Sequence, residues 1–294
     1  MPCDPQPQLD PFVVTSQGFG PLTREECRSQ RFSQPSRGLR IPSTCPDTLL
    51  TRCRAIELVS RADAVLWGPT AAELLGLPIP HRLQDAPIHV LVPEGLPRPR
   101  RTGVVARQAD IVAQEVITLS GLQVTSPART FTDLAQHVSL PDLVAIGDGA
   151  MRYQGLSVPE LQRVLDRRLR YPGKVRARQA IPLLDPRSES PQESRLRVHI
   201  VQDGLPIPEP NLVITDSFGQ FLARGDLGYR RWRIVIEYDG AFHDLPERRR
   251  ADATRRTLLR EHGWYVVEVV SEDLRYPHRA IGKVRRALQI KGAI

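Results

Sequence analysis

A short apolar run that ends in two acidic residues places the strongest constraint on this chain. Residues 232–236 read W-R-I-V-I and are followed by Glu237, Tyr238 and Asp239. The β-branched residues predict a strand, in which alternate side chains share a face, so Glu237 and Asp239 point the same way. Carboxylates on one face repel each other unless a cation lies between them or one is protonated. The run therefore predicts a candidate metal site at a strand end, and the alternative is an ordinary Asp-Gly turn.

The composition is that of a globular protein. At 294 residues the chain has room for about two domains. Its 40% hydrophobic and 25% charged residues fit this class. No apolar run approaches the ~20 residues that span a bilayer, and the N-terminal residues show no signal-peptide pattern, so we expect a cytoplasmic protein without membrane segments. The four cysteines form no CxxC pair, which favours free thiols over a zinc site.

The charge of the chain is basic. The formal net charge is +8, and three of the 41 basic residues are lysine, which leaves 38 arginines. Arginine binds phosphate in bidentate fashion, so the excess favours a polyanionic partner such as DNA. A coding bias towards arginine explains the same skew, and the charge alone does not separate the two.

The first segment of the chain carries a weak nucleic-acid signal. Residues 1–22 are rich in Pro, Gln and Gly, and we expect a flexible arm there. Thr23 and Glu26 form a capping box that predicts a short helix to about Phe32. A turn and a basic strand with Arg37 and Arg40 follow. This pattern suits either a small winged-helix element, with both arginines as DNA contacts, or an ordinary helix–turn–strand.

Residues 23–185 have the mixed pattern of an α+β domain. Arg129 and Asp133 are four apart on an expected helix and can form an ion pair there. Strands are expected at 88–92 and 103–107, and helices at 47–62, 68–75, from 126, at 141–152 and at 157–170.

Residues 186–294 show a different order of elements. The patterns predict a helix at 193–203, strands at 211–216, 219–227 and 231–239, a helix at 246–262, a strand at 264–270 and a helix at 277–289. The order α-β-β-β-α-β-α predicts an α/β domain whose mixed sheet is flanked by helices.

Further acids gather around Glu237 and Asp239. Asp226 lies near the end of the preceding expected strand, so three carboxylates reach one edge of the sheet, and Glu193 on the leading helix is a fourth candidate. Carboxylate oxygens are the ligands that Mg²⁺ prefers, and a bound metal activates water for attack on a phosphate. We therefore expect Asp226, Glu237 and Asp239 to bind Mg²⁺ or Mn²⁺.

Several residues beyond the second acid complete the expected site. His243 follows Asp239 by four residues and is a candidate general acid, general base or phosphate contact. Asp252 on the next helix is a candidate to orient an arginine or the histidine. Arg248 and Arg249, on the same helix, are candidate nucleic-acid contacts.

The last hundred residues resemble a known nuclease group. The matching residues are Glu193 in E-S-R-L-R, then G-L-P-I-P-E-P, Asp226 in G-D-L-G-Y, I-E-Y-D-G-x-x-H, Asp252 and G-W-Y-V-V. Together they are similar to the DUF559 family of very-short-patch-repair-like endonucleases in the PD-(D/E)XK superfamily. The resemblance implies a restriction-endonuclease-like fold and Mg²⁺-dependent hydrolysis of DNA phosphodiesters.

The resemblance also assigns roles to the site residues. Glu193, Asp226, Glu237, Asp239 and His243 become catalytic candidates. Asp239 occupies the place where the superfamily usually has lysine, and His243 is the expected substitute. Glu268 lies where an arginine is common, so a Glu268 that faced the site would add negative charge.

The N-terminal half resembles a second family. T-R-E-E, S-R-G-L-R-I-P, L-W-G-P-T-A-A-E-L-L-G-L-P and V-T-S-P-A-R-T-F-T-D-L-A are similar to AbiEi-type antitoxins and transcriptional regulators. This resemblance implies a winged helix followed by a mixed domain, and a DNA or protein partner for this half.

Three functions remain open at this point. The leading expectation is a metal-dependent DNA endonuclease with an AbiEi-like domain at 23–185 and a nuclease domain at 186–294. The alternatives are a DNA-binding regulator with a catalytically weak or inactive nuclease fold, and an antitoxin-like module that binds protein.

Overall fold

The chain forms two compact units. The structure, a computed structural model, describes residues 10–84, 87–168, 170–239 and 246–294, without the side chains of 246–253. Unit 1 consists of Met1–Leu134 and Glu160–Leu169, and unit 2 of Ala135–Pro159 and Arg170–Ile294. The family-based boundary between residues 185 and 186 stays a prediction, and it does not coincide with this division by packing.

Unit 1 begins with a small antiparallel sheet. Its strand order is β1-β3-β2, with β1 at Phe12–Val13, β2 at Phe32–Ser33 and β3 at Leu39–Pro42. The Phe12 side chain is 3% exposed, and its ring stacks on Phe19 with centroids 4.2 Å apart. The expectation of a flexible arm is therefore wrong for residues 10–22, because burial of Phe12 holds this segment on the sheet.

The capping box at Thr23 forms as predicted, but the helix behind it is one turn long. The Thr23 N–H donates to Glu26 Oε2 over 2.7 Å, and the Glu26 N–H donates to Thr23 Oγ1 over 3.3 Å. Only the 3₁₀ turn η1 at Glu26–Arg28 follows. The described residues 10–48 therefore do not form the winged-helix element that was one of the two options.

A five-stranded mixed sheet forms the body of unit 1. Its order is β6-β5-β4-β8-β7, and the pairs β4–β8 and β5–β6 are parallel. The strands expected at 88–92 and 103–107 are confirmed, and they pair with each other in parallel. The strands are β4 (Val65–Leu66), β5 (Ile88–Val92), β6 (Val104–Gln108), β7 (Val116–Leu119) and β8 (Leu122–Thr125).

Helices of unit 1 cover this sheet. Cys53 and Ile56 of one helix pack with Leu66, Val90 and Val124 in a shared core. The helices are α1 (Leu49–Glu57), α2 (Gly68–Leu74), α3 (Pro127–Leu134) and α5 (Val158–Arg167), with the 3₁₀ turns η2 (His81–Leu83) and η3 (Ala113–Glu115).

Unit 2 contains a four-stranded mixed sheet. Its order is β12-β11-β10-β9, in which β11 and β12 are parallel and the other pairs antiparallel. The strands are β9 (Glu209–Thr215), β10 (Phe221–Tyr229), β11 (Ile234–Asp239) and β12 (Tyr265–Val270), with the 3₁₀ turn η5 at Arg230–Trp232. The two sheets of mixed strands and the flanking helices confirm the α/β class.

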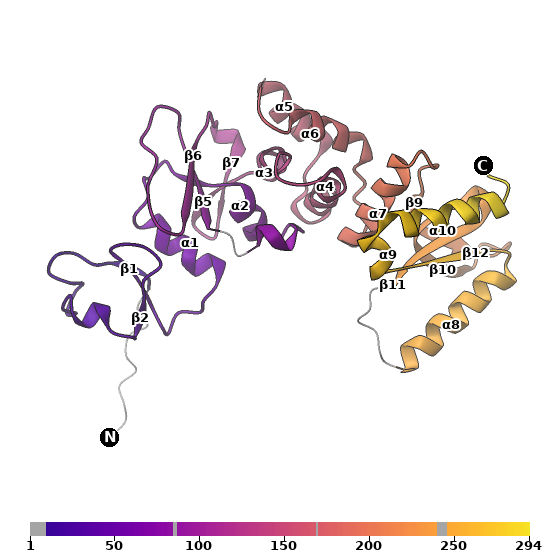
Figure 1. Cartoon of the computed structure of the whole chain (residues 1–294), viewed down its shortest axis with the longest axis horizontal. Helices are drawn as coiled ribbons and strands as arrows, with labels where there is room; N and C mark the ends of the chain where they lie inside the picture. The colour runs from indigo at the N-terminus through magenta and orange to yellow at the C-terminus, as the bar shows by residue number, and fades with distance from the viewer. Residues whose placement is uncertain (1–9, 85–86, 169, 240–245) are drawn as a thin grey trace. The chain divides into compact units, whose positions relative to one another are not determined.

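Helices cover both faces of this sheet (Figure 1). Leu196 of α7 (Pro191–Gln202) and Val284 of α10 (Pro277–Ile290) pack with Ile234 and Ile236 on one face. Leu259 of α8 (Pro246–Glu261) packs with Val235 on the other. The predicted order α-β-β-β-α-β-α is confirmed, with the short α9 (Ser271–Arg275) inserted before α10.

A buried ion pair ties α4 (Leu140–Gln154) to α7. Asp148 on α4 accepts hydrogen bonds from Arg197 Nη2 over 2.7 Å and from Ser194 Oγ over 2.6 Å. All three side chains are buried. The 3₁₀ turn η4 (Ile181–Leu183) follows α6 (Lys174–Ala180), and Arg197 also donates to the Leu183 carbonyl. Unit 2 is thus larger than the predicted C-terminal domain.

Candidate functional site

The alternation of β11 places Glu237 and Asp239 on the face that α8 covers. Ile234 and Ile236 belong to the core under α7 and α10, whereas Val235 belongs to the core under α8. Both acids share the parity of Val235 and contact Arg256 of α8, with Glu237 Oε2 3.6 Å from its Nε and Asp239 Oδ2 3.9 Å from its Nη2. The prediction that Glu237 and Asp239 share a face is confirmed.

Glu237 is a buried carboxylate that accepts no hydrogen bond from the described residues. Its side chain is 7% exposed, and neither oxygen has a hydrogen-bond partner among the described residues. Arg255 Nη2 approaches Oε2 to 3.2 Å and gives charge compensation. Burial raises the pKa of Glu237, the two guanidinium groups oppose this rise, and the nearby Asp226 carboxylate adds to it.

Asp226 terminates the pairing of β10 with β11. The antiparallel ladder runs from Tyr229–Ile234 to Leu227–Ile236, and beyond it Asp226 Oδ2 accepts the Tyr238 N–H over 2.6 Å. Burial raises the pKa of Asp226, although this hydrogen bond and the charge of Arg255 lower it. The Tyr238 N–H near the end of β11 therefore fixes the carboxylate of Asp226, which lies within β10.

Glu193 lies at the start of α7 and has a capping role. Its N–H donates to Ser190 Oγ over 3.2 Å, and its Oε2 accepts the Glu189 N–H over 2.8 Å. The side chain is buried, which raises its pKa, and the negative charges of Asp226 and Glu189 raise it further. Asp226 thus lies close enough to act electrostatically on both Glu193 and Glu237.

The acids are neighbours without forming a closed cluster of ligands. Among the residues that the structure describes, no three Asp, Glu, His or Cys side chains are arranged to hold a metal ion. Asp226 and Glu193 each commit one oxygen to a backbone N–H, and the Asp239 side chain is 51% exposed. His243 lies outside the described residues. The side chains of Arg248, Arg249 and Asp252 are also outside them, so their roles stay predictions.

Arg255 and Arg256 are site residues that the sequence analysis missed. They precede Leu259 by four and three residues, so they share with this buried anchor the helix face that meets the sheet. Arg255 Nη1 also donates to the Arg224 carbonyl over 3.2 Å. The spacing to the buried Leu259 is a signal in the sequence that identifies these two of the many arginines in α8.

Glu268 faces the site, and an arginine compensates its charge. On the parallel strand β12 it lies in register with Glu237. Arg256 Nη1 is 2.8 Å from Glu268 Oε2, so one guanidinium contacts both carboxylates and Asp239. The negative charge that the sequence analysis expected from Glu268 is therefore paired within the protein.

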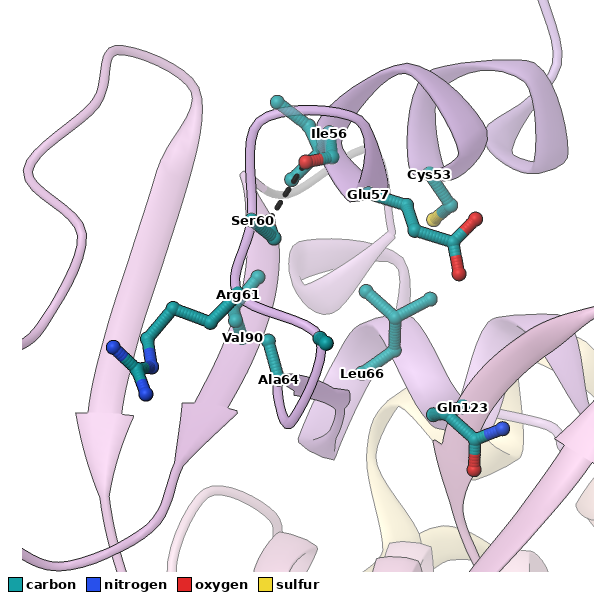
Figure 2. Close-up of a pocket in the computed structure, with 10 residues that line it drawn as sticks. Cys53, Ile56, Glu57, Ser60, Arg61, Ala64, Leu66, Val90 and Gln123 are labelled. Atoms are coloured by element: carbon teal, nitrogen blue, oxygen red, sulfur yellow. Dashed lines mark hydrogen bonds between the residues drawn. The ribbon is translucent and has the colours of Figure 1, made fainter. Parts of the chain in front are cut away.

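A cavity in unit 1 is a second candidate site. It has a volume of about 280 Å³ and lies between α1 and the sheet, where Cys53, Leu66 and Val90 line it (Figure 2). Burial raises the pKa of the Cys53 thiol to about 12, which removes it as a nucleophile. Ser60 Oγ donates to the Ile56 carbonyl, and Arg61 is paired with Asp63. Nothing in this cavity is activated for chemistry.

Comparison with known proteins relates the chain to one family of domains and to two mycobacterial proteins. Residues 63–182 match the AbiEi antitoxin C-terminal domain. The uncharacterized proteins MT2308 of Mycobacterium tuberculosis (strain CDC 1551 / Oshkosh) and Rv2248 of strain ATCC 25618 / H37Rv are each 31% identical over 245 residues. These alignments cover 83% of this chain and 88% of each relative. No solved structure gives a significant match.

The comparison confirms the AbiEi-like resemblance of the N-terminal half. The endonuclease resemblance of residues 193–274 stays a prediction. Within the described residues, no helix combines the length and the hydropathy needed to cross a membrane.

Proposed function

The chain belongs to the family of the two mycobacterial proteins and carries an AbiEi antitoxin C-terminal domain, and on this premise we propose that it is an antitoxin-like regulator that acts on DNA. The domain match over residues 63–182 is the observation that carries the proposal. The matched segment includes all five strands of the large sheet of unit 1, from β4 (Val65–Leu66) to β8 (Leu122–Thr125).

The charge of the chain supports a DNA partner over a protein partner. A formal net charge of +8 favours association with a polyanion. Arginine contributes almost all of the positive charge, and its planar guanidinium matches the geometry of phosphate. A regulator of this kind would bind phosphates for affinity and a limited set of base edges for specificity.

Selection from genomic DNA tests the regulator. The full-length protein is incubated with sheared DNA of its host at moderate salt, and the retained fragments are sequenced. We expect enrichment of a few fragments, among them the region upstream of its own coding sequence, and repression of a reporter that carries this region. Retained fragments that match the input in abundance would overturn the proposal.

A second candidate function is a metal-dependent DNA endonuclease in unit 2. The observation that favours it is the buried Glu237 carboxylate, whose two oxygens lack hydrogen bonds in the described residues. A buried carboxylate is costly when it lacks hydrogen bonds, and the two nearby arginines give Glu237 ion pairs but no hydrogen bonds. This makes Glu237 a candidate ligand. The order α7-β9-β10-β11-α8-β12 supports the nuclease resemblance, since that fold implies a mixed sheet between helices.

The described acids do not form a closed set of metal ligands, so a divalent cation would need the acids to move together or further ligands to join them. Glu237 would hold it, with Asp226 from the neighbouring strand β10 and the half-exposed Asp239 at the end of β11. A bound Mg²⁺ or Mn²⁺ supplies Lewis-acid activation of water and neutralisation of phosphate charge. Of the chain's own groups, Arg255 lies within 3.2 Å of Glu237 and is placed to hold a phosphate oxygen at this site. Glu193 would act indirectly, since its carboxylate caps the start of α7 through the Glu189 N–H.

Cleavage assays separate the endonuclease from the regulator. Supercoiled, linear, mismatched and single-stranded DNA are incubated with Mg²⁺ or Mn²⁺ and with wild type, Asp226→Ala or Glu237→Gln. Glu272→Gln is a matched control, because Glu272 is 67% exposed and paired with Arg279. We expect cleavage by wild type and by the control and its loss in both site variants. Cleavage that survives both would exclude this site, and binding without cleavage favours the regulator alone.

A further inference from the structure

A pocket on the small sheet of unit 1 collects four arginines. It has a volume of about 460 Å³ and is lined by Arg24, Arg28, Arg37 and Arg40, with Ser16 and Gln34 as further polar groups. Arg37 precedes Gly38, whose φ of +76° allows the chain to turn into β3. The turn and the 3₁₀ segment η1 thus bring arginines from separate parts of the sequence to one place.

The positive charges of this pocket have no acidic partners within the part of the chain that the structure describes. Among the described residues, none of the four guanidinium groups has a carboxylate within ion-pair distance. The nearby Glu26 carboxylate accepts both the N–H and the hydroxyl of Thr23. Like charges gathered in one pocket repel each other, so this arrangement is stabilised when an anion binds among them.

Arg40 makes the pocket a built site. It is 7% exposed, its Nε donates to the Cys27 carbonyl, and its Nη1 donates to the Leu39 carbonyl over 2.8 Å. Two backbone carbonyls fix the guanidinium, and no carboxylate of the described residues pairs with its charge. A buried, uncompensated charge is costly, and the pocket offers access for an anion that offsets this cost.

The chemistry of the lining identifies the anion. No aromatic side chain lines the pocket, so it lacks a platform on which a base could stack. The Arg37 carbonyl accepts a hydrogen bond from Arg101 Nη1 over 3.0 Å, which brings one further basic side chain to the edge of the pocket. Basic groups spread beyond a single cavity suit several phosphates in succession.

We propose that this pocket binds the backbone phosphates of nucleic acid without reading bases. The inference rests on the proposed function only in that both take a nucleic acid as the partner. Arg40 is the fixed anchor, and the exposed Arg24, Arg28 and Arg37 adapt around the phosphate. Such contacts set affinity and register, and they make binding depend steeply on salt.

Fluorescence anisotropy with a short duplex of arbitrary sequence tests the pocket across a series of salt concentrations. The test variant of the full chain is Arg28→Ala/Arg37→Ala. Arg31→Ala/Arg54→Ala removes the same charge from exposed positions of unit 1 outside the pocket. Each lost phosphate contact lowers the slope of log K against log salt by about 0.9. We expect the test variant to lose roughly one to two in slope and on the order of tenfold in affinity, and the control much less.

Arg40→Lys keeps the positive charge but loses the planar guanidinium that two backbone carbonyls hold in place. Circular dichroism checks that each variant is folded. We expect Arg40→Lys to bind the duplex more weakly than wild type at every salt concentration. Inorganic phosphate, titrated separately by calorimetry, distinguishes a free anion from the nucleic acid.

The outcomes separate this inference from the proposed function. If wild type binds the duplex and both double variants bind equally well, the pocket is excluded while a DNA-binding regulator stands. If phosphate binds in the pocket but the affinity for the duplex is unchanged in Arg28→Ala/Arg37→Ala, the site serves a free anion and the inference is overturned. If wild type does not bind DNA even at low salt, both fail.

Discussion

Two clusters of arginine and carboxylate differ in how completely their charges are compensated. In unit 1, Arg129 is 1% exposed and its Nε donates to both oxygens of Asp133, over 3.2 and 3.0 Å. Its Nη1 donates to the Asp110 carbonyl and to Glu115, and Arg167 also binds Glu115. In unit 2, Glu237 is almost as buried but accepts no hydrogen bond from the described residues.

The difference separates a structural role from a functional one. The Arg129 cluster uses its charges to join the η3 segment, α3 and α5 of one unit, and its geometry leaves little for a ligand to gain. The Glu237 site contains the same residue types at longer distances. A buried charge with poor compensation is retained at a cost in stability, which is typical of sites that bind a ligand.

Removal of the central arginine should give the largest loss of stability. Arg129→Met leaves Asp133 and Glu115 buried with fewer partners, and loss of one member of a buried pair costs about 3–5 kcal/mol. Urea unfolding of the variant measures this loss. Arg61→Ala is the matched control, since its pair with Asp63 lies at the surface, where water screens the attraction, and we expect a much smaller loss. Equal losses in both variants would contradict the structural role of the Arg129 cluster.

A divalent cation should stabilise the protein through the Glu237 site if the endonuclease candidate is right. Ligand at a hundredfold excess over its Kd adds about 2.7 kcal/mol to the free energy of unfolding. We expect this gain with Mn²⁺ for wild type and Glu272→Gln, and its loss in Asp226→Asn and Glu237→Gln. Thermal unfolding with and without Mn²⁺ checks it independently of activity. A gain that persists in both site variants places the cation elsewhere.

Much of the fold was predictable because local patterns agree with the packing. The strand at 231–239 alternates as its sequence indicates, and the buried Leu259 anchors α8 on the face that Val235 occupies. The small sheet was not predictable. Its strands β1 and β2 have two residues each, too few to show a period, and the burial of Phe12 depends on contacts with Phe19 and Phe32.

The acids of the candidate site were predictable, but their counter-ions were not. A β-strand fixes which acids share a face, so Glu237 and Asp239 followed from the sequence. The choice of Arg255 and Arg256 depends on the rotation of α8 against the sheet, which tertiary packing sets. Likewise, Asp148 and Arg197 are 49 residues apart, and no local pattern indicates their pairing.

The pH dependence of stability should differ in sign between Glu237 and Glu189. Burial raises the pKa of Glu237, so the folded state holds this proton more tightly than the unfolded state. Its ionisation therefore destabilises the protein above the raised pKa, and stability is regained as pH falls through that value towards the ordinary 4.5. Glu237→Gln should be more stable than wild type near neutral pH, and the difference should shrink on acidification.

Glu189 is the matched control with the opposite sign. Its hydrogen bond with Arg152 lowers its pKa, so its contribution is present above the ordinary value and is lost as pH falls through the lowered one. Glu189→Gln should be less stable than wild type at neutral pH. Urea unfolding at a series of pH values measures both. If Glu237→Gln also destabilises at neutral pH, its pairing with the two arginines outweighs its burial.

The smallest effect should come from Glu268, which shares Arg256 with Glu237. The Glu268 side chain is 39% exposed, so Glu268→Gln should cost about 0.2–1 kcal/mol, and added salt should reduce this cost. The variant also releases Arg256 from one of its carboxylates, which leaves more of its charge for Glu237 and offsets part of the loss. Urea unfolding of Glu268→Gln, Glu237→Gln and the double variant measures this coupling. A cost as large as that of Arg129→Met would mean that both clusters are structural and that the contrast between them fails.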